Sequence, residues 1–164
     1  MVQRRFSQFF GHVTARVRPD EESFVARILP PPGLALFAGM HVADRRHGLD
    51  VAKNLTAAGH DDADLLAAAL LHDAAKGRRM RLWHRVAGVL LERLAPSLLR
   101  RLAAAQPSSW RHPFWLYLHH GPMSAELAER AGCTPATARL IRGTPAGASE
   151  AQLLQALRAS DDAS

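Results

Sequence analysis

The sequence predicts an all-α protein, and three observations support this class. A short apolar run and several segments with helix-forming composition are present, whereas no segment shows the sustained alternation and β-branched enrichment of a strand. Prolines and glycines punctuate the chain at intervals that suit short helices. With 164 residues and 48% hydrophobic residues, the chain can bury the core of one compact domain.

The first clear break is a proline-rich stretch, Pro30 to Gly33. Consecutive prolines favour extended backbone and cannot continue a helix. We therefore expect a basic helical arm and a Pro-rich linker over residues 1–33, followed by a helical domain over residues 34–164. Four apolar residues of the arm recur at helical spacing: Phe6, Phe9, Phe10 and Val13. This pattern favours packing against the main body, with a membrane-surface helix as the alternative.

The next two elements are expected to form the centre of the domain. Residues 43–58 have helical composition and precede Gly59, a natural helix terminator. Asp61, Asp62 and Asp64 supply caps and charge for a second helix that we expect to run to about Lys76. Residues 65–71 of this helix are apolar nearly all round, which predicts a central, buried position.

Six further helices are expected after this pair, over residues 82–94, 97–105, 113–120, 124–131, 135–141 and 149–160. The breaks between them are expected at Pro96, Pro107, Pro122 and Gly143 with Pro145.

The composition indicates a basic intracellular protein. Lys and Arg number 21 against 15 Asp and Glu, which gives a formal net charge of +6 and favours anionic partners. Residues 76–101 hold much of this charge, which suits the phosphates of a nucleotide or of nucleic acid, or else forms a solvated helical face. The single cysteine, Cys133, excludes an internal disulfide and fits a cytoplasmic location. No apolar run is long enough to span a membrane, and no secretory signal is evident.

The chemistry is expected around the dipeptide His72-Asp73, which ends the apolar helix. Burial of an unpaired carboxylate is costly, so Asp73 requires either a salt bridge or a metal ion. Imidazole and carboxylate ligands together suit Fe, Mn, Co, Ni or Zn. Such a site would hold a divalent ion.

The segment RHGLDVAKNLTAAGHDDADLLAAALLHDAAK, residues 46–76, resembles the front half of an HD-domain metal-dependent phosphohydrolase. The resemblance implies an HD-like helical bundle in which His47, His72 and Asp73 bind the metal. The segment LLQALRASDDAS resembles the closing helix of that superfamily and implies Asp161 as the fourth ligand, with Asp162 as a rival.

A second segment, HHGPMSAELAERAGCTPATARLIRGTP, is similar to the bacterial HD-type symmetrical diadenosine tetraphosphate hydrolases. In this segment His120, with Gly121 and Pro122, matches a further metal ligand of that family. Thr144 stands where the family has an additional histidine. Whether one or two ions bind therefore stays open, and in the one-metal case His120 lines the substrate pocket.

These residues predict a phosphohydrolase that cleaves a phosphoester or phosphoanhydride in an anionic, nucleotide-like substrate. Asp73, Lys76 and His120 are the expected catalytic residues. Lys76 either holds a phosphate oxygen or stabilises the C-terminus of its helix. The alternative is a catalytically degenerate HD-fold module that binds nucleotide or nucleic acid without turnover. The substrate, the metal and the oligomeric state are not determined by the sequence.

Secondary candidates are His84 and His119 as further pocket residues, and Asp50 as an acceptor that orients His47 or as a solvated residue. The tryptophans are expected in the core, with base stacking as the alternative: Trp83, Trp110 and Trp115.

Overall fold

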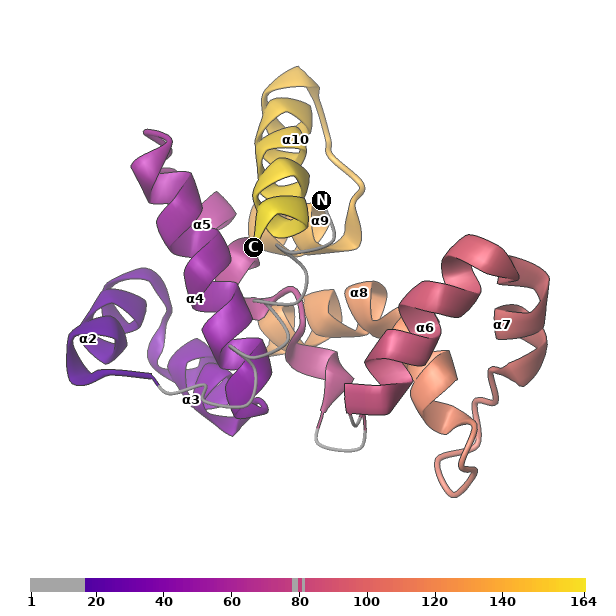
Figure 1. Cartoon of the computed structure of the whole chain (residues 1–164). Coiled ribbons are helices and arrows are strands. Elements are labelled where there is room, and N and C mark those ends of the chain that lie inside the picture. Colours follow the sequence, from indigo (N-terminus) through magenta and orange to yellow (C-terminus); the bar gives the residue numbers. More distant parts are fainter. Residues whose placement is uncertain (1–16, 78–79, 81) are drawn as a thin grey trace.

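The computed structural model describes residues 17–77, 80 and 82–164, and these residues form an all-α fold (Figure 1). The predicted class is confirmed, because the described residues contain α-helices and one short 3-10 helix but no strand. The helices are α2 (Pro19–Ile28), α3 (Pro31–Gly39), α4 (Val42–Ala57), α5 (Ala63–Leu71), η1 (Ala74–Lys76), α6 (Leu82–Leu94), α7 (Pro96–Leu102), α8 (His112–Arg130), α9 (Pro135–Arg142) and α10 (Ala148–Ala163). The predicted packing of the apolar residues from Phe6 to Val13 concerns a segment outside the described residues.

Helix α5 forms the centre of the core, as its all-round apolar sequence predicts. Every residue from Leu65 to Leu71 is buried, and α4, α9 and α10 pack around the helix. Gly48 of α4 faces the α5 backbone, where a Cβ atom would lie 3.0 Å from the carbonyl oxygens of Ala69 and Leu70. The missing side chain therefore allows α4 to approach α5 closely.

The helix expected to run to Lys76 is shorter than predicted. Helix α5 ends at Leu71, and the chain continues through a turn at His72 and Asp73 into the 3-10 helix η1. In a continuous α-helix the amide N–H of Ala75 would donate to the carbonyl of Leu71. It donates instead to the buried hydroxyl of Ser124 in α8, at 3.0 Å. This tertiary hydrogen bond supports the turn that carries His72-Asp73.

Pro122 does not divide two helices, contrary to the sequence prediction. One continuous helix, α8, runs from His112 to Arg130 with Pro122 inside it. A proline disfavours helical geometry at the preceding residue chiefly through a clash with that residue's Cβ and N–H. The preceding residue here is Gly121, which has no Cβ, so this part of the clash is removed.

The described part of the N-terminal arm belongs to the same core as the rest of the chain. Val25 and Leu29 join the core cluster, and Glu21 of α2 is buried against Arg46 and Lys53 of α4. The proline stretch also differs from an extended linker, because Pro31 begins helix α3. Proline is well tolerated in a first helical turn, where its missing N–H has no intrahelical partner. Among the described residues, position 33 therefore does not separate two packing units.

Helices α6 and α7 form a lobe on the far side of α8 from α4 (Figure 1). The lobe meets α8 where Gly88 packs on Tyr117, and where the Tyr117 hydroxyl donates to Glu92 at 2.6 Å. None of the described helices combines the length and the apolar character needed to cross a bilayer.

Candidate metal centre

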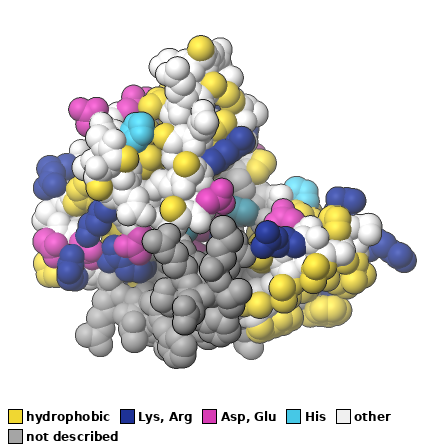
Figure 2. All heavy atoms as spheres, turned by 45° about the horizontal axis from the view of Figure 1, so that its top comes forward, with side chains coloured by type: hydrophobic (Ala, Val, Ile, Leu, Met, Phe, Trp, Pro, Cys, Tyr) yellow, Lys and Arg dark blue, Asp and Glu magenta, His cyan; other side chains and the backbone are white. Residues whose placement is uncertain are grey.

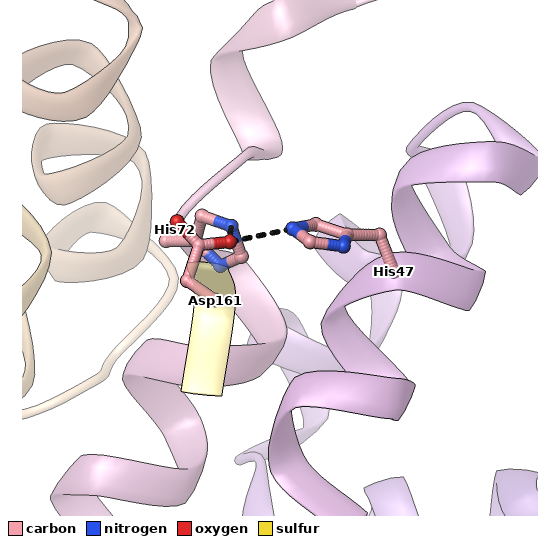
Figure 3. Close-up of side chains that lie close together, drawn as sticks. All are labelled: His47, His72 and Asp161. Carbon is pink, nitrogen blue, oxygen red and sulfur yellow. Dashed lines mark hydrogen bonds and ion pairs between the residues drawn. The ribbon is translucent and has the colours of Figure 1, made fainter. Parts of the chain in front are cut away.

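Three of the expected metal ligands come together from distant parts of the sequence. The Nε2 atom of His47 lies 2.7 Å from Oδ1 of Asp161, and Nε2 of His72 lies 3.6 Å from the same oxygen. One ligand atom from each of the three residues lies within 4.8 Å of the other two. Figure 3 shows His47 pointing from α4 towards Asp161, with His72 beside it.

Asp161 reaches this position because the end of α10 is fastened to α4. The hydroxyl of Ser160 donates to the carbonyl of Val51 at 3.0 Å, and the side-chain amide of Asn54 donates to the Ser164 hydroxyl at 2.9 Å. Asp161, next to Ser160, is thereby held against His47. Its neighbour Asp162 is exposed and is not part of the cluster. The geometry therefore favours Asp161 over its rival.

Asp73 extends the cluster into the interior of the protein. Its side chain is 2% exposed, and Lys76 donates to Oδ2 at 2.6 Å. The other oxygen, Oδ1, is buried and has no hydrogen-bond partner among the described residues. The Nε2 atoms of His72 and His120 lie 3.6 Å and 3.5 Å from it, which is longer than a hydrogen bond. Asp73 thus presents one unused oxygen between two imidazoles.

Both of these imidazoles are oriented by main-chain carbonyls. Nδ1 of His72 lies 2.9 Å from the carbonyl oxygen of Ala69, and Nδ1 of His120 lies 2.7 Å from that of Tyr117. A carbonyl can only accept, so Nδ1 carries the proton in each ring. In the neutral form of the ring, Nε2 then carries the lone pair that can bind a metal. Metal-binding histidines in proteins are commonly oriented by the same kind of hydrogen bond.

The charges of the cluster shift the pKa values of its members. Burial works against the charged form of His72, but Asp73 and Asp161 outweigh it and raise the pKa of His72 to about 9. Burial likewise opposes ionisation of Asp73, yet Lys76, His72 and His120 hold the pKa of Asp73 well below its usual range. Burial and Lys76 lower the pKa of His120. The carboxylates therefore stay ionised at neutral pH, and a metal ion that bound His72 would displace its second proton.

The donor set fits a divalent transition metal. Imidazole nitrogen and carboxylate oxygen suit ions such as Mn, Fe, Co, Ni or Zn. Oδ1 of Asp73, which has no hydrogen bond from the described residues and lies near the Nε2 atoms of His72 and His120, is the feature that a bound cation would satisfy. Lys76, for which the sequence left two roles open, contacts Asp73 and balances its charge.

The remaining candidates lie outside this cluster. Thr144 is exposed, and Asp50 forms its ion pair with Arg46. The exposed ring of His119 stacks on Trp115, with 4.5 Å between ring centroids. His84 is buried and stacks on Trp83.

A pocket of about 200 Å³ opens beside the cluster. His72, His120 and Asp161 line it together with two arginines that sequence reasoning did not select, Arg142 and Arg158. Arg158 lies one helical turn before Asp161 in α10, a spacing that could have indicated it. Arg142 pairs with Glu129 at 3.4 Å, whereas Arg158 forms no ion pair with the described carboxylates. The pocket therefore offers a free guanidinium near the imidazoles and carboxylates.

Comparisons with protein-family models, with curated proteins and with solved structures found no match to this chain.

Proposed function

We propose that this chain is a metal-dependent phosphohydrolase that cleaves a phosphoester or phosphoanhydride in a nucleotide-like substrate. His47, His72, Asp73 and Asp161 would hold a divalent ion, and His120 would either join a second ion or hydrogen-bond the substrate. A bound divalent ion supplies a water of lowered pKa and polarises a phosphoryl oxygen.

The observation that carries the proposal is the unsatisfied oxygen of Asp73. A buried carboxylate oxygen without a hydrogen bond is costly, and the two nearest imidazole nitrogens lie 3.6 and 3.5 Å from it. A divalent cation that replaced the Nε2 proton of His72 would be a ligand for both this oxygen and the ring nitrogen. His47 and Asp161, which lie beside His72, add further ligands.

Other residues near the metal ligands would balance charge and bind the substrate. Lys76 neutralises Asp73 and fixes its second oxygen. Arg142 and Arg158 line the pocket on the side of α9 and α10, where they would bind substrate phosphates. Phosphoryl transfer depends mainly on such positioning and on charge stabilisation. His120 lies at both the cluster and the pocket, so it could contact the substrate.

The second candidate function is a module of the same fold that binds nucleotides without turnover. Thr144 favours it, because this residue is exposed and its hydroxyl is a poor ligand where the resembled family has histidine. The two arginines of the pocket would serve either function.

The test compares wild-type protein with Asp73→Ala and with Asp162→Ala, which removes an exposed carboxylate next to the site. Each protein is loaded with Mn²⁺, desalted and analysed for metal, and is then assayed on a panel of nucleotides. Wild type and Asp162→Ala should retain metal and hydrolyse a member of the panel, whereas Asp73→Ala should lose both properties. Circular dichroism checks that all three proteins are folded.

Wild-type metal content in the Asp73→Ala protein would refute the assigned site. A wild-type protein that lacks both metal and turnover but binds nucleotides would instead favour the second function.

A further inference from the structure

Helix α6 has an apolar stripe that faces away from the protein. The stripe consists of Trp83, Val86, Leu90 and Leu94, which fall within about 80° of one another on a helical projection. All four are exposed, with exposed fractions of 51% for Trp83, 52% for Leu90 and 80% for Leu94. The adjacent lobe residues Val89, Leu98 and Trp110 are exposed as well.

Helix α6 contacts α8 through His84, Gly88 and Glu92, which lie off the stripe, and Trp83 of the stripe also meets Phe114 edge-on, with 6.1 Å between ring centroids. A Cβ atom at Gly88 would lie 2.7 Å from the Tyr117 ring, and Glu92, one turn later, accepts a hydrogen bond from the Tyr117 hydroxyl. The helix thus packs on α8 near its start and through Gly88 and Glu92, and it leaves Val86, Leu90 and Leu94 exposed. Contiguous exposed apolar surface of this kind marks an interaction site.

The charge around the stripe indicates the kind of partner. Between residues 77 and 111 the sequence contains eight arginines and one acidic residue, Glu92, which is engaged with Tyr117. Arg93, Arg100 and Arg101 are exposed on α6 and α7. Figure 2 shows hydrophobic side chains gathered over the lobe, with basic side chains at its edge. The partner surface should therefore be both apolar and anionic.

We propose that the α6–α7 lobe docks on an anionic lipid bilayer, with the apolar stripe inserted at the boundary between headgroups and acyl chains. Apolar residues on one face, arginines beside them and exposed tryptophans are the features of helices that bind in the plane of a membrane. A second copy of this chain fits less well, because pairing two lobes would bring two arginine-rich rims together. Nucleic acid would use the arginines but not the stripe. The proposal is independent of the metal centre.

The test is co-sedimentation of the full chain with phosphatidylcholine vesicles, with and without phosphatidylglycerol. Three proteins are compared: wild type, Leu90→Glu/Leu94→Glu, and the control Gln152→Glu/Gln155→Glu. The control adds the same charge to exposed positions of α10 and leaves the stripe intact. Leu94→Glu alone serves as a second variant if the double change impairs folding, since Leu94 is the most exposed residue of the stripe.

Wild type should sediment with the anionic vesicles and much less with neutral ones. The Leu90→Glu/Leu94→Glu protein should bind about tenfold or more weakly than the control, because it loses apolar insertion in addition to charge attraction. Equal binding of the two charge variants, or no sedimentation of wild type, would overturn the proposal. So would a wild-type dimer that Leu90→Glu/Leu94→Glu converts to a monomer without any lipid binding, since the stripe would then be a self-association surface.

Discussion

Asp73 is 2% exposed, and its Oδ1 accepts no hydrogen bond while Oδ2 pairs with Lys76. Oδ1 lies 3.6 Å from Nε2 of His72 and 3.5 Å from Nε2 of His120, close enough for charge attraction but too far for a hydrogen bond. This oxygen, between His72 and His120, is the strongest residue-scale indication of a ligand, because native structures rarely leave such an atom unsatisfied.

Arg158 provides a residue-scale prediction about substrate binding. Its guanidinium lines the pocket, packs over Gly143 and has no carboxylate partner among the described residues. Arg158→Gln should raise KM for the best nucleotide substrate by about tenfold while kcat changes little, because one charge-assisted contact to a phosphate is lost. Arg130→Gln, an exposed position paired with Glu126, is the control. An unchanged KM in the Arg158 variant would exclude this role.

The sequence indicates candidate ligands but not the residues that position them. Residue type, order and resemblance point to His47, His72, Asp73, His120 and Asp161. Ser124 and Ser160 were not, because a serine acquires its role only from what the fold brings against it. Ser124 binds the turn at Ala75, and Ser160 binds the carbonyl of Val51 in α4.

At the scale of helices, the close contact between α4 and α5 sets the distance between His47 and His72. Gly48 makes this contact possible, because a methyl group there would press on two backbone carbonyls. Gly48→Ala should lower the free energy of unfolding by about 1–3 kcal/mol and weaken Mn²⁺ binding. Urea unfolding and calorimetric titration measure the two effects.

Gly39→Ala is the matched control, because a Cβ atom at Gly39 would meet nothing within 4 Å. It should change stability by about 0.5 kcal/mol or less and leave metal affinity intact. If both alanine variants behaved alike, the close approach at Gly48 would not position the site.

The ion-pair cluster between α2 and α4 makes stability depend on pH. Burial of Glu21 opposes its ionisation, but Lys53, the Arg18 amide and Arg46 outweigh burial and lower the pKa of Glu21 to about 2. A folded-state pKa below the ordinary value of 4.5 means that the contribution is present above about pH 4.5 and is lost as the pH falls towards 2.

Glu21→Gln should therefore lower the free energy of unfolding by about 2–3 kcal/mol at neutral pH, and the difference from wild type should fall to about half or less near pH 3. Urea titrations at both pH values measure this, with the exposed neighbour Glu22→Gln as the control. A Glu21→Gln effect that did not change with pH would show that packing, rather than charge, accounts for the loss.

The helices were predictable where local signals were sufficient. The expected bounds 82–94 match α6, and those of α4, α9 and α10 differ by only a few residues at either end. Where the predicted helix bounds are wrong, the cause is a tertiary contact or the identity of an adjacent residue. Ser124 captures the amide that would have continued α5, and Gly121 permits Pro122 inside α8. Pro31 stands in the first turn of α3, where its missing N–H has no intrahelical partner to lose.

At the scale of the whole molecule, the fold brings residues 47 and 161 together although 114 positions separate them. The all-α class and the buried centre at α5 follow from composition and patterning. The pocket beside the cluster and the outward direction of the α6 stripe do not, because both depend on how α8 packs against its neighbours. An amphipathic sequence alone does not show whether its apolar face is covered.

The central claim is that the side chains of His47, His72, Asp73 and Asp161 bind one divalent cation. Anomalous diffraction from crystals grown with Mn²⁺ tests it most directly. The claim predicts a manganese peak about 2.0–2.3 Å from Nε2 of His47, Nε2 of His72 and one carboxylate oxygen each of Asp73 and Asp161. Well-ordered side chains with no anomalous peak between them, at a manganese concentration that saturates the crystal, would contradict it.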